Sequence, residues 1–196
     1  MVKIAVLVSG GGTNLQALID GAPYENGTLS LVVSSHPDAY ALERAKKAGI
    51  ETVVLSPKDY QNRETYTSTI TDTLLYHDIG LVVFAGFLFI LSPDFANVFK
   101  DRAINVHPSL IPAFCGKGFH GLKVHRAVLD SGDKVTGATV HFVTAGADEG
   151  PIISQKSVDV RPNDTPETLQ QRVMEECERP LLVAAVRNLC KEMGGC

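Results

Sequence analysis

The stretch KIAVLVSGGGTNL, residues 3–15, decides the fold. Residues 3–9 are mostly apolar and rich in β-branched side chains, the pattern of a strand that is buried on both faces of a parallel sheet. Three glycines then interrupt the apolar run, and a helix is expected to start around Leu15. A strand that passes through a glycine loop into a helix is the first unit of an α/β fold.

The same alternation of strand and helix continues through the first half of the chain. Short apolar segments predict strands at 29–34, 51–55, 81–85 and 103–107, and helical spacing predicts helices at 39–48, 63–77 and 93–98. We therefore predict an α/β fold with a doubly wound, mostly parallel central sheet that is Rossmann-like in its N-terminal half.

The second half of the chain changes pattern. Residues 136–143 and 152–158 predict two strands, which we expect to pair antiparallel at the end of the sheet. Thr165 is suited to cap a helix whose first residue is Pro166. Pro180 is expected to kink or break that helix.

The composition indicates one soluble domain rather than a nucleic-acid or membrane protein. The chain has 196 residues, 44% of them hydrophobic and 20% charged, with a net charge of −4. We expect a single domain over 1–196, because a chain of this length buries a sizeable core. The acidic balance offers no basic surface for nucleic acid. The longest apolar stretch, 81–91, is too short to cross a bilayer.

The start of the chain and the cysteines suggest a cytoplasmic protein. Met1 leads straight into a strand pattern, so no signal peptide is expected. The four cysteines have neither a CxxC spacing nor another zinc pattern; they are Cys115, Cys177, Cys190 and Cys196. We therefore expect free thiols, no bound metal and a cytoplasmic location.

An amide and an imidazole lie two residues apart at the end of a predicted strand. Asn105 and His107 should face the same side of that strand, because side chains alternate along it. Pro108 then ends the strand, and a loop rich in glycine follows up to Gly121. A hydrogen-bond donor beside a titratable ring is what an acyl-transfer centre requires. We interpret the pair as a candidate catalytic centre.

The glycine loop at residues 9–15 predicts an anion site. Glycines let a ligand approach the backbone closely, and free N–H groups at a helix N-terminus bind anions. A tight turn with no ligand is the alternative, but Thr13 and Asn14 add side-chain donors and favour phosphate. The loop lacks the Lys of a P-loop, and Leu15 is too large for a dinucleotide fingerprint. The second strand also ends without an acid, so a phosphomonoester is predicted.

Several of these segments follow the carboxyl ends of predicted parallel strands. Ligands of open α/β sheets bind in the crevice outside those ends. We therefore expect residues 10–14, 86–91 and 105–109 to converge on one edge of the sheet.

Four blocks of the sequence, in their order and context, resemble the phosphoribosylglycinamide formyltransferases, a folate-dependent family of purine synthesis. The blocks are 9–15, 85–93, 104–112 and 137–153, and the resemblance covers nearly the whole chain. The Asn-x-His-Pro-Ser motif with the later Asp-x-Gly-Pro is typical of the wider formyltransferase fold, and the glycine loop narrows the resemblance to this family. It implies transfer of a formyl group from 10-formyltetrahydrofolate to the amine of 5'-phosphoribosylglycinamide. The attack would be direct, through a tetrahedral intermediate and without a metal.

The resemblance also implies roles for individual residues. The implied catalytic residues are Asn105, His107 and Asp148. Phosphate would bind to Gly12, Thr13 and Asn14, and ribose to Glu175. Folate would contact Arg63, Leu88, Phe89, Ile90, Leu91 and Asn105, with His141 and Thr139 in support. The half at about 1–100 would then bind the nucleotide, and the half at about 101–196 would hold the catalytic and folate-binding residues.

Some features depart from the family pattern. Phe89 stands where relatives often have a basic residue, which puts a charge contact to the folate tail in doubt. Segment 175–180 reads EECERP, where relatives usually have Glu-His before Tyr-Pro. The loop 114–121 is longer than in many relatives, and its Lys117 either approaches an anionic substrate or lies in solvent. The family also implies a cis peptide bond at 111–112.

Two other functions stay open at this point. One is hydrolysis of formyltetrahydrofolate, with water in place of the amine, and the other is a non-catalytic phosphosugar- or folate-binding protein. In each case we expect small-molecule partners, no nucleic acid, no membrane, and a monomer or homodimer. The remaining histidines have no partner at ligand spacing and are expected at the surface or in loops; they are His36, His77, His120 and His125.

Overall fold

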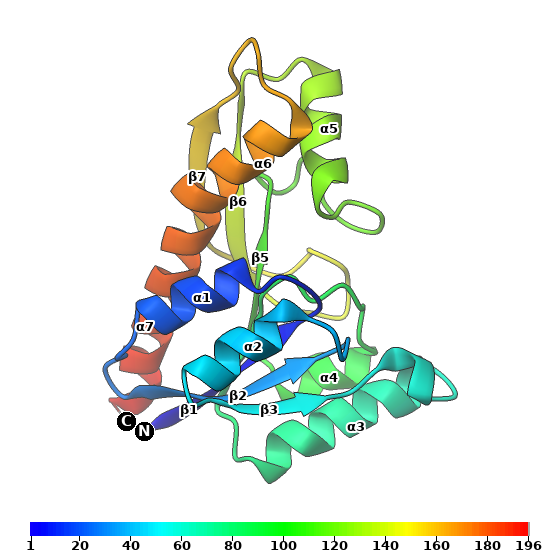
Figure 1. Ribbon diagram of the computed structural model, residues 1–196, viewed down its shortest axis with the longest axis vertical. Helices are drawn as coiled ribbons and strands as arrows, with labels where there is room; N and C mark the ends of the chain where they lie inside the picture. The colour runs from blue at the N-terminus through cyan, green and yellow to red at the C-terminus, as the bar shows by residue number, and fades with distance from the viewer. Residues whose placement is uncertain (196) are drawn as a thin grey trace.

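A seven-stranded mixed sheet forms the middle of the molecule (Figure 1). The computed structural model describes residues 1–195, and the predicted free thiol of Cys196 lies outside the described residues. In space the strands follow the order β3-β2-β1-β4-β5-β6-β7. Their bounds are β1 Val2–Val8, β2 Gly27–Ser34, β3 Glu51–Val54, β4 Leu81–Phe84, β5 Ala103–His107, β6 Val135–Phe142 and β7 Ile152–Asp159.

The direction of the strands confirms the predicted fold. Strands β1 to β5 are parallel to their neighbours, whereas β5 pairs with β6, and β6 with β7, in antiparallel fashion. The sheet is therefore doubly wound and mostly parallel, with two antiparallel strands added by the C-terminal half.

Helices cover both faces of this sheet (Figure 1). Residues of α1, α2 and α7 share one buried cluster with the sheet, and residues of α3 and α4 share the cluster on the opposite face. A third cluster joins α5 and α6 to β6 and β7. The helical segments are α1 Thr13–Asp20, α2 Tyr40–Lys47, η1 Pro57–Asp59, α3 Arg63–Tyr76, α4 Pro93–Val98, α5 Leu122–Ser131, α6 Pro166–Val173, η2 Met174–Glu178 and α7 Arg179–Gly194.

Strand β1 shows why its sequence is an unbroken apolar run. Ile4, Val6 and Val8 belong to the cluster with α1 and α7, whereas Ala5 and Leu7 belong to the cluster with α3. All five side chains have 0% exposure. Burying a large aliphatic side chain completely stabilises a fold by roughly 1.5–3 kcal/mol, so alternate residues of one strand hold both helical layers against the sheet.

Pro180 was expected to kink or break the helix that begins at Pro166. The helix does not break there; before Pro180 it passes through a π-helical turn, η2. Proline lacks a backbone N–H, and its ring clashes with the carbonyl group four residues earlier. The wider turn places Pro180 at the start of α7, where the missing N–H costs little. The chain therefore continues as one helical rod with one irregular turn.

The loops at the carboxyl ends of β1, β4 and β5 lie together at one edge of the sheet, as predicted. Among residues 1–195 we find no helix with the length and apolar character needed to cross a membrane.

We expect Gly137→Ala to destabilise the fold, because Gly137 of β6 lies close against the neighbouring strand β7. A Cβ atom there would overlap the backbone oxygen of Lys156 and would lie 2.9 Å from a methyl group of Leu110. The free energy of unfolding should fall by roughly 1–3 kcal/mol, as is typical of overpacking. Urea denaturation followed by far-UV circular dichroism measures it.

The matched control for this prediction is Gly195→Ala. The nearest atom to a Cβ at Gly195 is the oxygen of Lys191 at 3.4 Å, an ordinary contact. This control should change stability by less than about 0.5 kcal/mol. Equal stability of the two variants would contradict the packing argument.

Candidate active site

The segments that were predicted to meet at one edge of the sheet line a single cleft of about 600 Å³. Its walls come from the glycine loop, the connection after β4, the end of β5, the loop before α5 and the loop after β6. Gln170, Met174 and Glu178, from α6 and η2, complete the lining. The expected convergence of residues 10–14, 86–91 and 105–109 is therefore confirmed.

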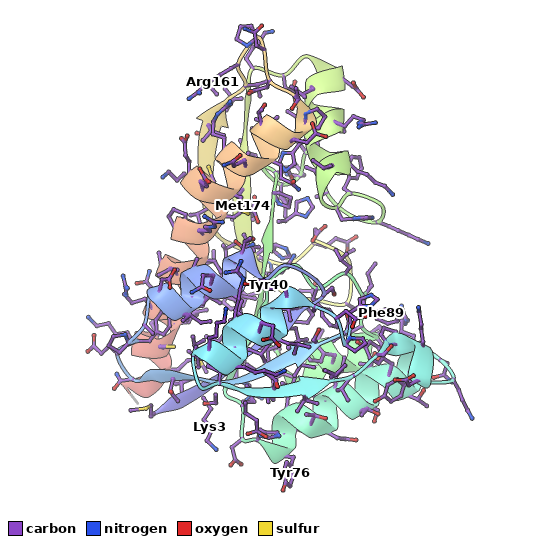
Figure 2. All side chains as sticks on the ribbon, viewed as in Figure 1. Lys3, Tyr40, Tyr76, Phe89, Arg161 and Met174 are labelled. Atoms are coloured by element: carbon purple, nitrogen blue, oxygen red, sulfur yellow. The ribbon has the colours of Figure 1, made fainter. Side chains whose placement is uncertain are left out.

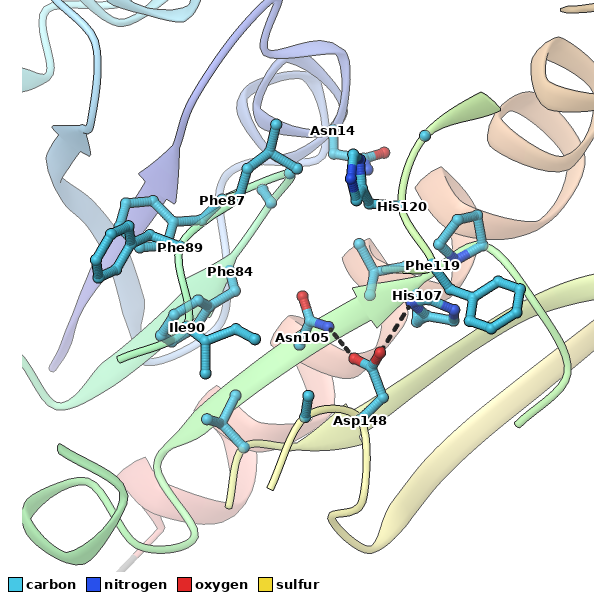
Figure 3. Close-up of a pocket in the computed structure, with 18 of the residues that line it drawn as sticks. Asn14, Phe84, Phe87, Phe89, Ile90, Asn105, His107, Phe119, His120 and Asp148 are labelled. Carbon is cyan, nitrogen blue, oxygen red and sulfur yellow. Dashed lines mark hydrogen bonds and ion pairs between the residues drawn. The ribbon is translucent and has the colours of Figure 1, made fainter. Parts of the chain in front are cut away.

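Asn105 and His107 face the cleft from the end of β5 (Figure 3). Antiparallel pairing sets Asn105 opposite His141 and His107 opposite Thr139. The Asn105 amide nitrogen is 3.3 Å from Oδ1 of Asp148 and 3.2 Å from Nε2 of His141. Both contacts are long for hydrogen bonds, so the amide group can exchange them for a better acceptor.

His107 is buried between two acceptors. Its Nε2 is 2.9 Å from the carbonyl oxygen of Phe114, and its Nδ1 is 3.4 Å from Oδ2 of Asp148. Since a carbonyl group only accepts, Nε2 must carry a proton to make the first bond. Only a ring that carries protons on both nitrogens can donate to both partners. The ring therefore presents Nδ1 to the carboxylate of Asp148 while Nε2 bonds to the backbone.

The carboxylate of Asp148 lies close to several hydrogen-bond donors of the site (Figure 3). Asp148 comes from the loop between β6 and β7. In addition to Asn105 and His107, the backbone N–H of Gly116 donates to its Oδ2 at 2.9 Å. Burial alone would raise the pKa of Asp148, but His141, the charge of His107 and the Gly116 N–H outweigh burial and lower it. The carboxylate form is thus favoured.

Three more polar residues hold the site in place. His141 turns Nδ1 toward the Phe142 carbonyl oxygen at 2.9 Å and leaves Nε2 near Asn105 and Asp148. Thr139 does not line the cleft; its hydroxyl donates to the Ser109 carbonyl oxygen at 2.7 Å. The same hydroxyl accepts from Ile111 N–H and from Gln155, which fixes the loop that follows β5. This loop contains the expected cis peptide bond before Pro112.

The glycine loop passes into α1 with a backbone conformation that favours glycine at residue 12. Gly12 has a positive φ of 68°, and a Cβ there would lie 2.6 Å from the Cβ of Ala41. The Arg44 Nε donates to the carbonyl oxygen of Gly11 at 2.9 Å and holds the loop from behind. Thr13 and Asn14 begin the helix and line the cleft.

Glu178 is a site residue that the sequence analysis missed. It is buried, lines the cleft and accepts a hydrogen bond from the Asn14 amide at 2.9 Å. Burial raises the pKa of Glu178, and the Asn14 donor and the nearby charge of Arg179 oppose that rise. Glu175, predicted at the ribose, is exposed, bonds to Gln171 and is not among the residues that line the cleft. Within the π turn, Glu178 therefore faces the cleft and Glu175 faces outward.

Residues 88–91 form one side of the cleft together with Phe84 and Phe87 (Figure 3). The N–H of Leu88 donates to the Ser9 hydroxyl at 2.9 Å, which ties this wall to the glycine loop. Phe89 packs edge-on against Tyr66, with ring centroids 4.7 Å apart. Arg63, by contrast, begins α3 at the surface, beside Glu64, and is not among the residues that line the cleft.

His125 differs from the sequence prediction, which placed it at the surface or in a loop. It lies on the inner side of α5 with 0% exposure, and neither ring nitrogen has a hydrogen-bond partner among residues 1–195. Burial, aided by the charge of His107, lowers the pKa of His125 to about 4. Lys117, left open above, does line the cleft. No group of three potential metal ligands is found in the described part of the chain.

Comparison with known proteins gives the class of the protein. The family model described as formyl transferase matches residues 2–186, so the chain belongs to the formyl transferase family. It is similar to glycinamide ribonucleotide transformylase 1 from Symbiobacterium toebii, with a TM-score of 0.90, 40% identity, and coverage of 98% of this chain and 89% of that one.

Within this family, the chain is similar to curated proteins that share one name. The phosphoribosylglycinamide formyltransferase of Escherichia coli (strain K12) is 39% identical over 93% of this chain and 86% of its own length. The chloroplastic enzyme of that name from Arabidopsis thaliana is 38% identical over 97% of this chain. The chain spans 66% of the Arabidopsis protein, and 13% of the trifunctional purine biosynthetic protein adenosine-3 of Drosophila melanogaster, to which it is 41% identical.

Asp148→Asn should make stability less dependent on pH. Asp148 has a positive φ of 59°, which Asn tolerates, so this substitution chiefly removes the charge. Because the folded-state pKa is lowered, the carboxylate stabilises the fold above its unfolded pKa, and this contribution is lost as the pH falls through the folded value. Urea denaturation should show that the free energy of unfolding of the variant is lower than that of the unaltered protein at pH 7. In acid this difference should be smaller. A difference independent of pH would contradict the pKa argument.

Proposed function

We propose that this protein transfers the formyl group of 10-formyltetrahydrofolate to the primary amine of 5'-phosphoribosylglycinamide, a step of de novo purine biosynthesis. One observation carries the proposal: an anion loop, an amide–imidazole–carboxylate cluster and an apolar wall face the same cleft. The names of the similar proteins support it. In this proposal the half at about 1–100 supplies the phosphate loop, and the half at about 101–196 the catalytic cluster.

The ribonucleotide would bind with its phosphate at the start of α1. The N–H groups of Gly12, Thr13 and Asn14 and the Thr13 hydroxyl are suited to a phosphate dianion, which the helix N-terminus also favours. We place the ribose hydroxyls at Glu178 rather than Glu175, because Glu178 lies in the cleft beside Asn14. Its carboxylate can accept from both hydroxyls of a ribose.

The folate would bind along residues 88–91. The aromatic and aliphatic side chains of this wall cover the faces of a flat ring, and its backbone offers polar groups at the ring edge. Asn105 would contact the same cosubstrate from β5. Arg63 is outside this wall, so we propose at most a contact with the charged tail of the folate, at the surface. Phe89, packed on Tyr66, adds no charge there.

Transfer would proceed by direct attack of the amine. Its nitrogen forms a bond to the formyl carbon, the bond from that carbon to the folate nitrogen breaks, the amine loses a proton and the folate nitrogen gains one. Charge develops on the formyl oxygen during attack. We assign its stabilisation to the Asn105 amide, which can exchange its long contacts for this acceptor.

We assign proton movement and charge stabilisation to His107, held by Asp148. A doubly protonated ring can support the developing oxyanion or deliver a proton toward the leaving nitrogen. Asp148 faces Nδ1 of the ring, and His141 orients both Asp148 and Asn105. The cluster thus couples a hydrogen-bond donor to a proton source within one small space.

The test of this proposal is a paired-substrate assay. Purified protein with 10-formyltetrahydrofolate and 5'-phosphoribosylglycinamide should release tetrahydrofolate, followed by its absorbance. Formate release without any amine acceptor would instead show a formyltetrahydrofolate hydrolase. Binding of both compounds without turnover on any acceptor would show a non-catalytic binding protein.

His107→Ala should lower kcat by roughly 100-fold to 10,000-fold, the usual contribution of a general acid or base. The KM values should change far less, since the ring supports the reacting atoms rather than the rest of the substrate. Steady-state kinetics with each substrate varied in turn measure both. His36→Ala, at an exposed histidine outside the cleft lining, is the matched control. A near-normal rate for His107→Ala would refute the assignment.

A further inference from the structure

The π turn η2 brings Met174 against the glycine loop and Arg179 against Met174. The N–H of Arg179 donates to the carbonyl oxygen of Met174, five residues earlier. In a π turn, residues four and five apart lie above one another, and such turns are frequent at functional sites. Met174 and Arg179 therefore lie on the same side of the helical rod. Figure 2 labels Met174 at the junction of α6 and α7, and its sulfur contacts Thr13 of α1.

Two donors converge on the sulfur atom of Met174. The Thr13 hydroxyl is 3.1 Å from Sδ, and Nη2 of Arg179 is 3.7 Å from the same atom. A thioether is a weak hydrogen-bond acceptor, so neither donor has a partner that matches its strength. Met is also flexible and rearranges at low cost. The sulfur thus fills a position that suits an oxygen atom with negative charge.

Arg179 is short of partners; it is not among the residues that line the cleft, and Met174, which does line it, lies next to its guanidinium. Its Nε is buried and has no hydrogen-bond partner among residues 1–195. None of the ion pairs formed by the described residues includes Arg179. The carboxylate of Glu178 is near enough to feel its charge, but Oε2 of Glu178 already accepts from Asn14. A partly buried guanidinium without a bonded anion costs free energy, which an anionic ligand would recover.

We propose that Arg179 is a further phosphate ligand of this site, which acts together with Thr13 after Met174 moves aside. This inference rests on the proposed function for the nature of the phosphate ester. The flat guanidinium offers paired N–H groups that match the oxygens of a phosphate.

A different role for Arg179 would be to neutralise Glu178 only. The two roles are separated by comparing the ribonucleotide with the same molecule without its phosphate, the glycinamide riboside. A phosphate ligand matters only for the first substrate, whereas a partner of Glu178 matters equally for both, since both contain the ribose.

The experiment measures kcat/KM of Arg179→Met on both substrates. We expect a loss of roughly 10-fold to 100-fold on the ribonucleotide, as for a charge-assisted hydrogen bond, with little change on the riboside and no change in KM for formyl-folate. Arg179→Lys should recover part of the loss. Arg187→Met is the matched control, because Arg187 lies exposed on the same helix and, among residues 1–195, donates only to the Gly21 carbonyl oxygen. Equal losses on both substrates would overturn the proposal.

A second measurement does not depend on turnover. Calorimetric titration with inorganic phosphate at constant ionic strength should show binding that weakens about tenfold or more in Arg179→Met and not in Arg187→Met. Circular dichroism confirms that both variants are folded. Unchanged phosphate binding overturns the role of Arg179 even if formyl transfer is observed, as does a lack of binding by the unaltered protein. Weakened binding in a protein without formyl transfer supports Arg179 and removes the proposed function.

Discussion

The double pairing of β5 is the constraint on which the rest of the structure depends. On one side β5 runs parallel to β4 and completes the α/β half, and on the other it runs antiparallel to β6. Its last residues therefore belong to both halves of the chain at once. The register with β6 sets Asn105 beside His141, and the turn between β6 and β7 then brings Asp148 to the same place. A shift of one residue would turn both β5 side chains away from the cleft.

Charge in the cleft is arranged in two separate groups. Asp148 is surrounded by donors, which keep its carboxylate charged although it is mostly buried. On the other side, Glu178 and Arg179 lie near each other without a direct bond, and Asn14 satisfies only one of them. In the first group the carboxylate of Asp148 has donors within the protein, as expected of a preorganised cluster. In the second group Nε of Arg179 has no hydrogen-bond acceptor among residues 1–195, as expected where an anionic ligand binds.

The sequence predicted more of the catalytic centre than of its surroundings. Asn105 and His107 are two residues apart on one strand, so their common orientation follows from local geometry. Glu175 and Glu178 are three apart on a helix, where a change of one backbone hydrogen bond alters which side chain faces inward. Pro180 signalled an irregular turn in the sequence, but not that the turn would be π-helical. The burial of His125 has no local signal, because it depends on the packing of α5.

By itself, the sequence determined the layers of the fold and the edge of the sheet at which the cleft lies, because apolar periodicity and glycine positions act over a few residues. It also singled out Asn105, His107 and the glycine loop, all of which line that cleft. Only the tertiary structure decided which distant side chains meet them: Asp148, brought by a hairpin, and Glu178 and Met174, which reach Asn14 and Thr13. Those neighbours are set by strand register and helix packing, which depend on the whole chain rather than on any segment.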